Sequence, residues 1–391
     1  MARQFNPKRV LMLLSSHLLE EFFRRRAELT EIPWSKLEQF DNLIVYDAWQ
    51  ALPEERRRQV QVILQDINEL ADERGLAVLA QEVQWRYPDR LPEFAAVEGR
   101  ADKALWTYLY LPQAFEEAAL FARADALARG RYWVKRNSLP HAPITVTLDK
   151  REALGSKLAA YYRLMQGRGF FCQVDHLQRA NGDDYFFAYL DDYPDARLVF
   201  DDTGRIRRHS ERGVFDNVFV FSPTDGTLEL YAKGGKELHT PLQEIFCKEA
   251  LGLDVNPTAP DKAAYHLDGL TSLYCNFPTD PADRIAEVRV RRLRMEVRDQ
   301  PRRKVTLDSD TTGHKNDIYD MIERYLDSEH LPLNKVRVTL ATFRLTFASD
   351  GGKPKTLTFN VSHPNSCDLK SKPEEMRVIG ERCLKSWGIA Q

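Results

Sequence analysis

Residues 288–297 have the sequence VRVRRLRMEV, and residues 336–345 have the sequence VRVTLATFRL. Both stretches alternate apolar and polar side chains, the period-2 pattern of a strand with one buried face. A second strand pattern follows each of them, RKVTL from Arg303 and KTLTFNV from Lys355, and each pair leads into an amphipathic helical pattern. The repetition predicts a tandem ββα domain over 284–391, with a four-stranded antiparallel sheet and two helices on one face.

The apolar alternation shifts by one residue in both long strands. Val290 is followed by Leu293 in the first strand, and Leu340 by Phe343 in the second. Such a shift is typical of a β-bulge, and we place Arg292 at the first one. Because the apolar residues are expected to face the helices, the opposite face holds threonines and the arginines Arg289, Arg291, Arg292, Arg294, Arg298, Arg337 and Arg344.

This predicted face is strongly basic in a nearly neutral chain. The 391 residues include 56 Lys+Arg and 58 Asp+Glu, whereas the four predicted strands (287–298, 303–307, 335–347 and 355–362) hold eleven basic and two acidic residues. Guanidinium groups and hydroxyls suit phosphate oxygens, and the face lacks aromatic residues for stacking on bases. Three interpretations remain: contact with nucleic-acid backbone, contact with an acidic protein surface, or a face that is polar only because water covers it. The acidic surface would belong to another protein, to a second copy or to the aspartate-rich stretch 183–202 of this chain.

The remainder of the chain predicts two further modules and a connector. Residues 1–138 have helical apolar spacing and predict a helical domain. Residues 145–252 predict a helix, a meander and a helix beginning at Thr240, with short strands near 185–190, 196–200, 205–208, 214–221 and 227–232. The proline-rich stretch 253–283 predicts an irregular connector. The expected fold class is therefore an α+β multidomain protein.

Four aspartates are weak candidates for metal ligands. Asp191 and Asp201 lie at the ends of predicted strands, where two carboxylates that share a divalent cation would activate water, although turns also favour aspartate. Asp308 and Asp310 belong to a D-x-D-x-T pattern, which aspartyl phosphotransferases use together with a downstream acidic pair, and no Asp-Asp pair follows Asp310 in this chain. These residues make a metal-dependent phosphohydrolase or nuclease the catalytic alternative.

No common catalytic or nucleotide-binding motif occurs in the sequence. The five cysteines form no C-x-x-C pair, which predicts reduced thiols, and no apolar run is long enough for a membrane-spanning helix. We therefore expect a soluble cytoplasmic protein without a cofactor. A non-catalytic assembly or regulatory component is the favoured function, with a protein-interaction scaffold as a further alternative.

Overall fold

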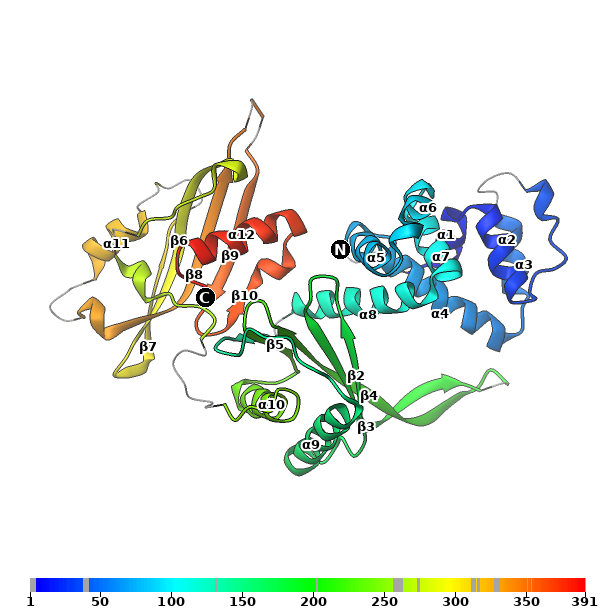
Figure 1. Cartoon of the computed structure of the whole chain (residues 1–391), viewed down its shortest axis with the longest axis horizontal. Coiled ribbons are helices and arrows are strands. Elements are labelled where there is room, and N and C mark those ends of the chain that lie inside the picture. Colours follow the sequence, from blue (N-terminus) through cyan, green and yellow to red (C-terminus); the bar gives the residue numbers. More distant parts are fainter. Residues whose placement is uncertain are drawn as a thin grey trace. The chain divides into compact units, whose positions relative to one another are not determined.

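The computed structural model describes residues 5–37, 42–130, 132–201, 203–255, 263–272, 275–310, 314, 317–326, 331–349, 351–352 and 354–390. Within these ranges it has twelve α-helices and two five-stranded antiparallel sheets, which confirms the mixed α+β class (Figure 1). The chain divides into two compact units. Unit 1 comprises Met1–Ala126 and Arg179–Asn181, and unit 2 comprises Leu127–Gln178 and Gly182–Gln391.

Unit 1 is built from helices. They are α1 (Pro7–Leu13), α2 (Ser16–Arg25), α3 (Leu43–Gln50), α4 (Glu54–Leu70), α5 (Glu73–Arg86), α6 (Leu91–Ala96), α7 (Arg100–Tyr110) and most of α8 (Pro112–Ala128). On α4, Val60, Leu64 and Ile67 are fully or almost fully buried at helical spacing. Across both units, no helix of the described ranges is both long and apolar enough to cross a membrane.

The first sheet of unit 2 has the strand order β1-β5-β4-β3-β2. Its strands are β1 (Trp133–Arg136), β2 (Cys172–Gln178), β3 (Asp184–Phe200), β4 (Ile206–Ser222) and β5 (Thr227–Tyr231), and α9 (Leu148–Gln166) and α10 (Lys236–Glu249) cover one face (Figure 1). Phe219 stacks on Phe246 of α10 with 4.9 Å between ring centroids. The consecutive pairing of β3, β4 and β5 is the expected meander, to which the structure adds β2 and β1 at the two sides, but α10 begins before Thr240 and includes Pro241.

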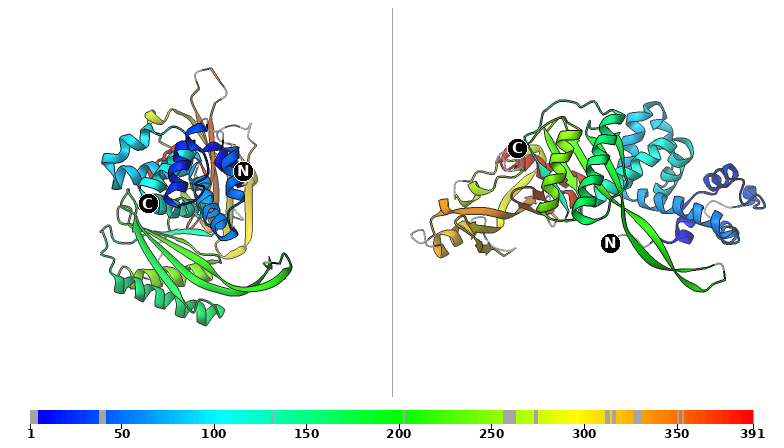
Figure 2. Two further views of the ribbon diagram at one scale, coloured as in Figure 1. Left: turned by 90° about the vertical axis from the view of Figure 1, so that its right-hand side faces the viewer. Right: turned by 90° about the horizontal axis from the view of Figure 1, so that it is seen from below.

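The prediction of four short strands between 185 and 221 is wrong. β3 and β4 are each 17 residues long and continue through the expected breaks. Their register shifts between Asp191 and Pro194, so the proline lies at a bulge, a position that strands tolerate. Beyond this bulge the two strands leave the sheet as a two-stranded ribbon, the β3–β4 arm (residues 194–200 and 206–212; Figure 2).

The second sheet of unit 2 has the strand order β10-β9-β8-β6-β7. Its strands are β6 (Ile285–Val297), β7 (Gln300–Asp308), β8 (Val336–Phe347), β9 (Thr356–Ser362) and β10 (Ser366–Cys367). Residues of α11 (Asp317–Tyr325) and α12 (Glu374–Ser386) share one apolar core with the sheet. The four predicted strands are present, and β10 corrects the expected number to five because two residues are too few to show a periodic pattern.

Later segments of the chain cover the outer edge of β1. The backbone N–H of Lys135 donates to the carbonyl of Asn365 at 3.0 Å, and Arg136 forms an isolated antiparallel bridge with Ala263. β1 therefore has backbone partners on both sides, although it is the last strand of its sheet.

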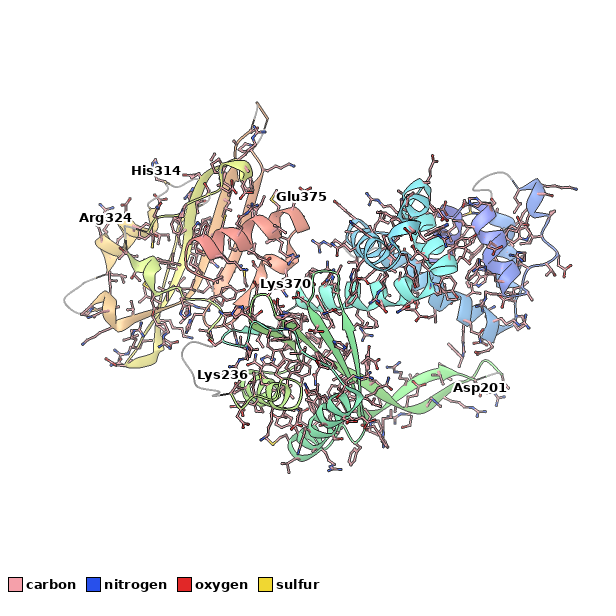
Figure 3. The ribbon with its side chains drawn as sticks, in the orientation of Figure 1. Asp201, Lys236, His314, Arg324, Lys370 and Glu375 are labelled. Carbon is pink, nitrogen blue, oxygen red and sulfur yellow. The ribbon has the colours of Figure 1, made fainter. Side chains whose placement is uncertain are left out.

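Charged side chains join the two sheets at the same place. Lys370 forms an ion pair with Glu229 of β5, and its ammonium lies 4.6 Å from the ring centroid of Trp133 (Figure 3). Lys385 of α12 donates to Asp225 at 2.9 Å. The two sheets of unit 2 are therefore joined by backbone bonds and by ion pairs.

We expect Phe343→Ala to lower the free energy of unfolding by about 3–5 kcal/mol, because the fully buried ring contacts Phe359 and Trp387 and its removal leaves a cavity. Urea unfolding measures the loss. Val378→Ala on α12, where the side chain is 47% exposed, is the control and should change stability by less than about 0.5 kcal/mol. Equal effects of the two substitutions would contradict the described core.

Candidate functional site

The bulges of the second sheet decide which side chains lie opposite its helices. In β6 the register with β8 skips Arg291, and not Arg292 as predicted. In β8 the register skips Thr339, so Leu340 lies outside the apolar core instead of within it. Both strands therefore contain a bulge, as the shifts in the alternation predicted. The bulge in β6 lies one residue earlier than expected, and the bulge in β8 lies before Leu340 instead of after it.

We call the side of the second sheet opposite α11 and α12 the arginine face, and all seven predicted arginines belong to β6, β8 or the residue after β6. Arg292, Arg298 and Arg337 are exposed, whereas Arg291, Arg294 and Arg344 are half-buried. Arg289 is only 5% exposed, which corrects the expectation that it contributes to an open surface.

The segment after β7 accounts for the burial of Arg289. The Arg289 guanidinium donates to Ser309 Oγ at 3.1 Å and to the Asp310 carbonyl at 3.2 Å, and it lies 3.8 Å from the Asp317 carboxylate. The Arg291 guanidinium donates to the Ser309 carbonyl at 3.0 Å. These two arginines therefore hold the segment after β7 against β6.

Two further arginines form ion pairs within the same module. Arg292 donates through Nε to Asp308 on the neighbouring strand at 2.9 Å, and Arg298 pairs with Asp268. These carboxylates neutralise part of the positive charge that the sequence predicts. The net charge of the arginine face is therefore smaller than the sequence alone indicates.

Arg294, Arg337 and Arg344 are the other members of the arginine face. The Nε atom of Arg294 is buried without a hydrogen-bond partner among the described residues, and buried polar atoms normally have one. Arg344 lies directly opposite Arg289 across the β6–β8 pair, and like charges at such positions repel each other. An anion bound on this face would pair with the Arg294 guanidinium group, which has no ion pair among the described residues, and would reduce the repulsion at Arg344.

The structure does not bring Asp191 and Asp201 together. Asp191 lies near the middle of β3 and Asp201 directly follows its last residue, so ten residues of extended chain, about 33 Å at ~3.3 Å per residue, separate them. Asp191 accepts hydrogen bonds from the Phe171 N–H at 2.7 Å and from Arg212 at 3.3 Å. Asp191 and Asp201 therefore cannot share one metal ion.

The other candidate aspartates also have structural partners. Asp201 lies in the turn at the far end of the arm (Figure 3), where a hydrogen bond from the Thr203 hydroxyl is the largest of the effects that lower its pKa. Asp308 pairs with Arg292, and the Asp310 carbonyl accepts from Arg289. Thr312 of the D-x-D-x-T pattern lies outside the described residues. Among those that are described, no cluster of three His, Cys, Asp or Glu side chains is placed to hold a metal.

Arg168 fixes the base of the β3–β4 arm. Its guanidinium lies 3.9 Å from the ring centroid of Phe215 and donates to Asp192 at 2.6 Å. Burial raises the pKa of Asp192, but hydrogen bonds from Arg168 and from the Tyr193 N–H outweigh this effect and lower it overall. Tyr193 in turn donates to the carbonyl of Gln166 at the end of α9. The arm is therefore anchored where it leaves the sheet.

Cys172 and His176 do not form a catalytic pair. They are four residues apart on β2, about 13 Å in an extended strand. His176 instead lies 2.8 Å from the Asp184 carboxylate, and burial raises the pKa of the Cys172 thiol to about 12. The Cys172 thiol is therefore not in the thiolate state that a catalytic thiolate–imidazolium pair requires.

Comparison with protein-family models gives no match for this chain, and comparison with curated proteins gives no significant relative. Functional inference therefore depends on the geometry of the two surfaces described above, the arginine face and the arm.

We expect Asp191→Ala to lower the free energy of unfolding by about 1–3 kcal/mol, because it leaves the Phe171 N–H and Arg212 without their acceptor. Thermal and urea unfolding measure the loss, with the exposed Asp195→Ala as the control. Adding Mg²⁺ or Mn²⁺ should leave both proteins unchanged. A metal-dependent stabilisation that Asp191→Ala abolishes would restore the metal hypothesis.

We expect the five thiols to react slowly with a disulfide reagent at pH 7.5. Burial raises the pKa of Cys172 and Cys367 to about 12, raises that of Cys247 and Cys383 to about 11, and also raises that of Cys275, so the thiol form predominates at each. Absorbance should report all the thiols only after unfolding in guanidinium. A fast equivalent from the native chain would reveal an activated cysteine.

Proposed function

We propose that this chain is a non-catalytic assembly or regulatory component that binds nucleic-acid backbone through its arginine face. The observation that supports this most directly is the half-buried guanidinium group of Arg294, which forms no ion pair with any residue that the structure describes. Arg337 is exposed on the next strand, and Arg344 lies opposite another arginine. Together these side chains present donors for a row of anionic oxygens.

The polar side chains around these arginines favour the backbone over the bases as the ligand. On β9, Thr356, Thr358 and Asn360 lie on the same side of the sheet as Arg344, and β8 adds Thr346. Hydroxyl and amide groups bind phosphate and sugar oxygens, whereas reading unpaired bases requires aromatic side chains for stacking. The proposed contact is therefore independent of base sequence.

An acidic protein surface is the second candidate, because carboxylates also satisfy arginines. The distribution of partners within the chain supports it: Asp308 and Asp268 already neutralise Arg292 and Arg298. A carboxylate of another protein would form an ion pair with Arg294, as Asp308 and Asp268 do with Arg292 and Arg298. A DNA probe without protein distinguishes the two candidates, because only the nucleic-acid candidate predicts that the chain binds it.

We expect the triple variant R294E/R337E/R344E to abolish binding of a fluorescein-labelled DNA duplex. For the wild-type protein, the logarithm of affinity should fall as the logarithm of salt concentration rises. Replacing any one phosphate-binding arginine should reduce the steepness of that dependence by about one. Fluorescence anisotropy between about 50 and 200 mM salt, a range that keeps binding measurable, tests both expectations.

The matched control is K157E/R163E/K236E, which reverses three exposed charges on α9 and α10 and should retain binding. If the wild-type chain fails to bind DNA but binds polyglutamate, and the arginine triple loses that binding, the acidic-protein candidate replaces the nucleic-acid one. If neither probe binds, or if the control loses as much affinity as the triple, the arginine face is not a binding site.

A further inference from the structure

The β3–β4 arm has two faces of different chemistry. Residues directly opposite in the β3–β4 ladder share a face, so Leu198 lies with Arg208 and Phe200 with Ile206. Alternate residues of β4 extend this face toward the base of the arm. We call the set the apolar arm face: Leu198, Phe200, Ile206, Arg208, Arg212 and Val214.

The charges of the reverse face are paired with one another. The ion pairs there are Arg197 with Asp195 at 3.9 Å, His209 (when protonated) with Glu211 at 3.8 Å, and Arg207 with Asp201. These exposed pairs contribute little to stability, but they balance the charges of the reverse face. The reverse face therefore has the character of an ordinary solvated surface.

The apolar arm face, in contrast, exposes large hydrophobic side chains. Leu198 is 71% exposed, Phe200 72% and Ile206 62%. The arm has four strongly exposed large hydrophobic residues in its described part, and three of them lie on this face; the fourth, Val199, lies on the reverse face. Groups of exposed hydrophobic side chains of this kind are typical of interaction sites.

The charges of the apolar arm face are all positive. Arg212 donates to Asp191 at the base, whereas Arg208 has no ion-pair partner among the residues that the structure describes. Asp191 lies opposite Val214, before the arm begins, and from Pro194 to Arg212 no carboxylate belongs to this face in the described part of the arm. A ligand that covers the hydrophobic side chains must therefore be compatible with the positive charge of Arg208, which lies within the contact.

The backbone of the arm is also open to a further strand. The ladder with β2 ends at Leu190, and the ladder with β5 begins at Val218, so neither outer edge of the arm has a strand partner in the described structure. Open edges bind extended segments by adding a strand. The contacts of Arg168 with Phe215 and Asp192 fix the base, which reduces the entropy cost of binding a ligand.

We propose that the apolar arm face binds an extended protein segment that alternates apolar and acidic side chains. Its apolar residues cover Leu198, Phe200 and Ile206, and its carboxylates meet Arg208. This surface is separate from the arginine face and does not depend on the function proposed for it.

Charge favours this ligand over two others. A second copy of the chain would bring its own Arg208 and Arg212 but no carboxylate from the same face, so two apolar arm faces in contact would repel each other. Nucleic acid would meet a ribbon whose residues 194–212 carry five arginines but also four carboxylates. A segment with its own acidic and apolar side chains avoids both repulsions.

Selection from a displayed library of short random peptides on the immobilised full chain tests the proposal. We expect the enriched peptides to alternate apolar residues with Asp or Glu. Fluorescence anisotropy of one such synthetic peptide should show that L198S/F200S, and separately R208E, weaken binding about tenfold or more. The replaced side chains are exposed, so circular dichroism and thermal unfolding should be unchanged.

Matched controls lie on the reverse face of the same ribbon. V199S repeats the removal of an apolar side chain, and R197E repeats the charge reversal; both should retain peptide binding. The variant R294E/R337E/R344E should also retain it, which separates this result from the outcome for the arginine face.

Three outcomes would overturn the proposal. The first is enrichment of basic peptides, or of none. The second is a loss of affinity in V199S and R197E equal to that in L198S/F200S and R208E. The third is concentration-dependent dimerisation in analytical ultracentrifugation that L198S/F200S abolishes, which would identify a second copy as the occupant.

Discussion

Alternation of side chains between the two faces of a strand is the constraint on which both sheets of unit 2 depend. Each sheet buries one face beneath two helices, so a shift of one residue would move the core side chains of a strand into solvent. Bulges allow the alternation to change without that cost. They occur at Arg291 in β6 and before Pro194 in β3, and both places adjoin a candidate binding surface.

The sequence predicts the second sheet well because its pattern is local. Val288, Val290, Phe343 and Leu345 alternate with polar residues, and each is buried in the structure. The burial of Arg289 could not be predicted in the same way, because it depends on where the chain runs after β7. The two-residue strand β10 has no periodic signal at all.

The first sheet is harder to predict for a different reason. The sequence Asp191-Asp192-Tyr193-Pro194 has the composition of a turn, yet hydrogen bonds to the Asp191 carboxylate and the contacts of Arg168 hold it within a continuous strand. Those partners lie about twenty residues away in the sequence. Turn composition therefore predicts the wrong length for β3 and β4, although the turn expected after Phe200 does lie between the two strands.

The segments that cover the outer edge of β1 are synthesised long after β1 itself. β1 is complete at Arg136, but the residues that close its outer edge, Ala263 and Asn365, follow about 130 and 230 residues later. At ~5–20 residues per second, the ribosome takes roughly 10 to 50 s to supply the second of them. Until then the outer edge of β1 is not fully covered, and Lys135 and Arg136 are the charges that disfavour its pairing with a neighbouring nascent chain.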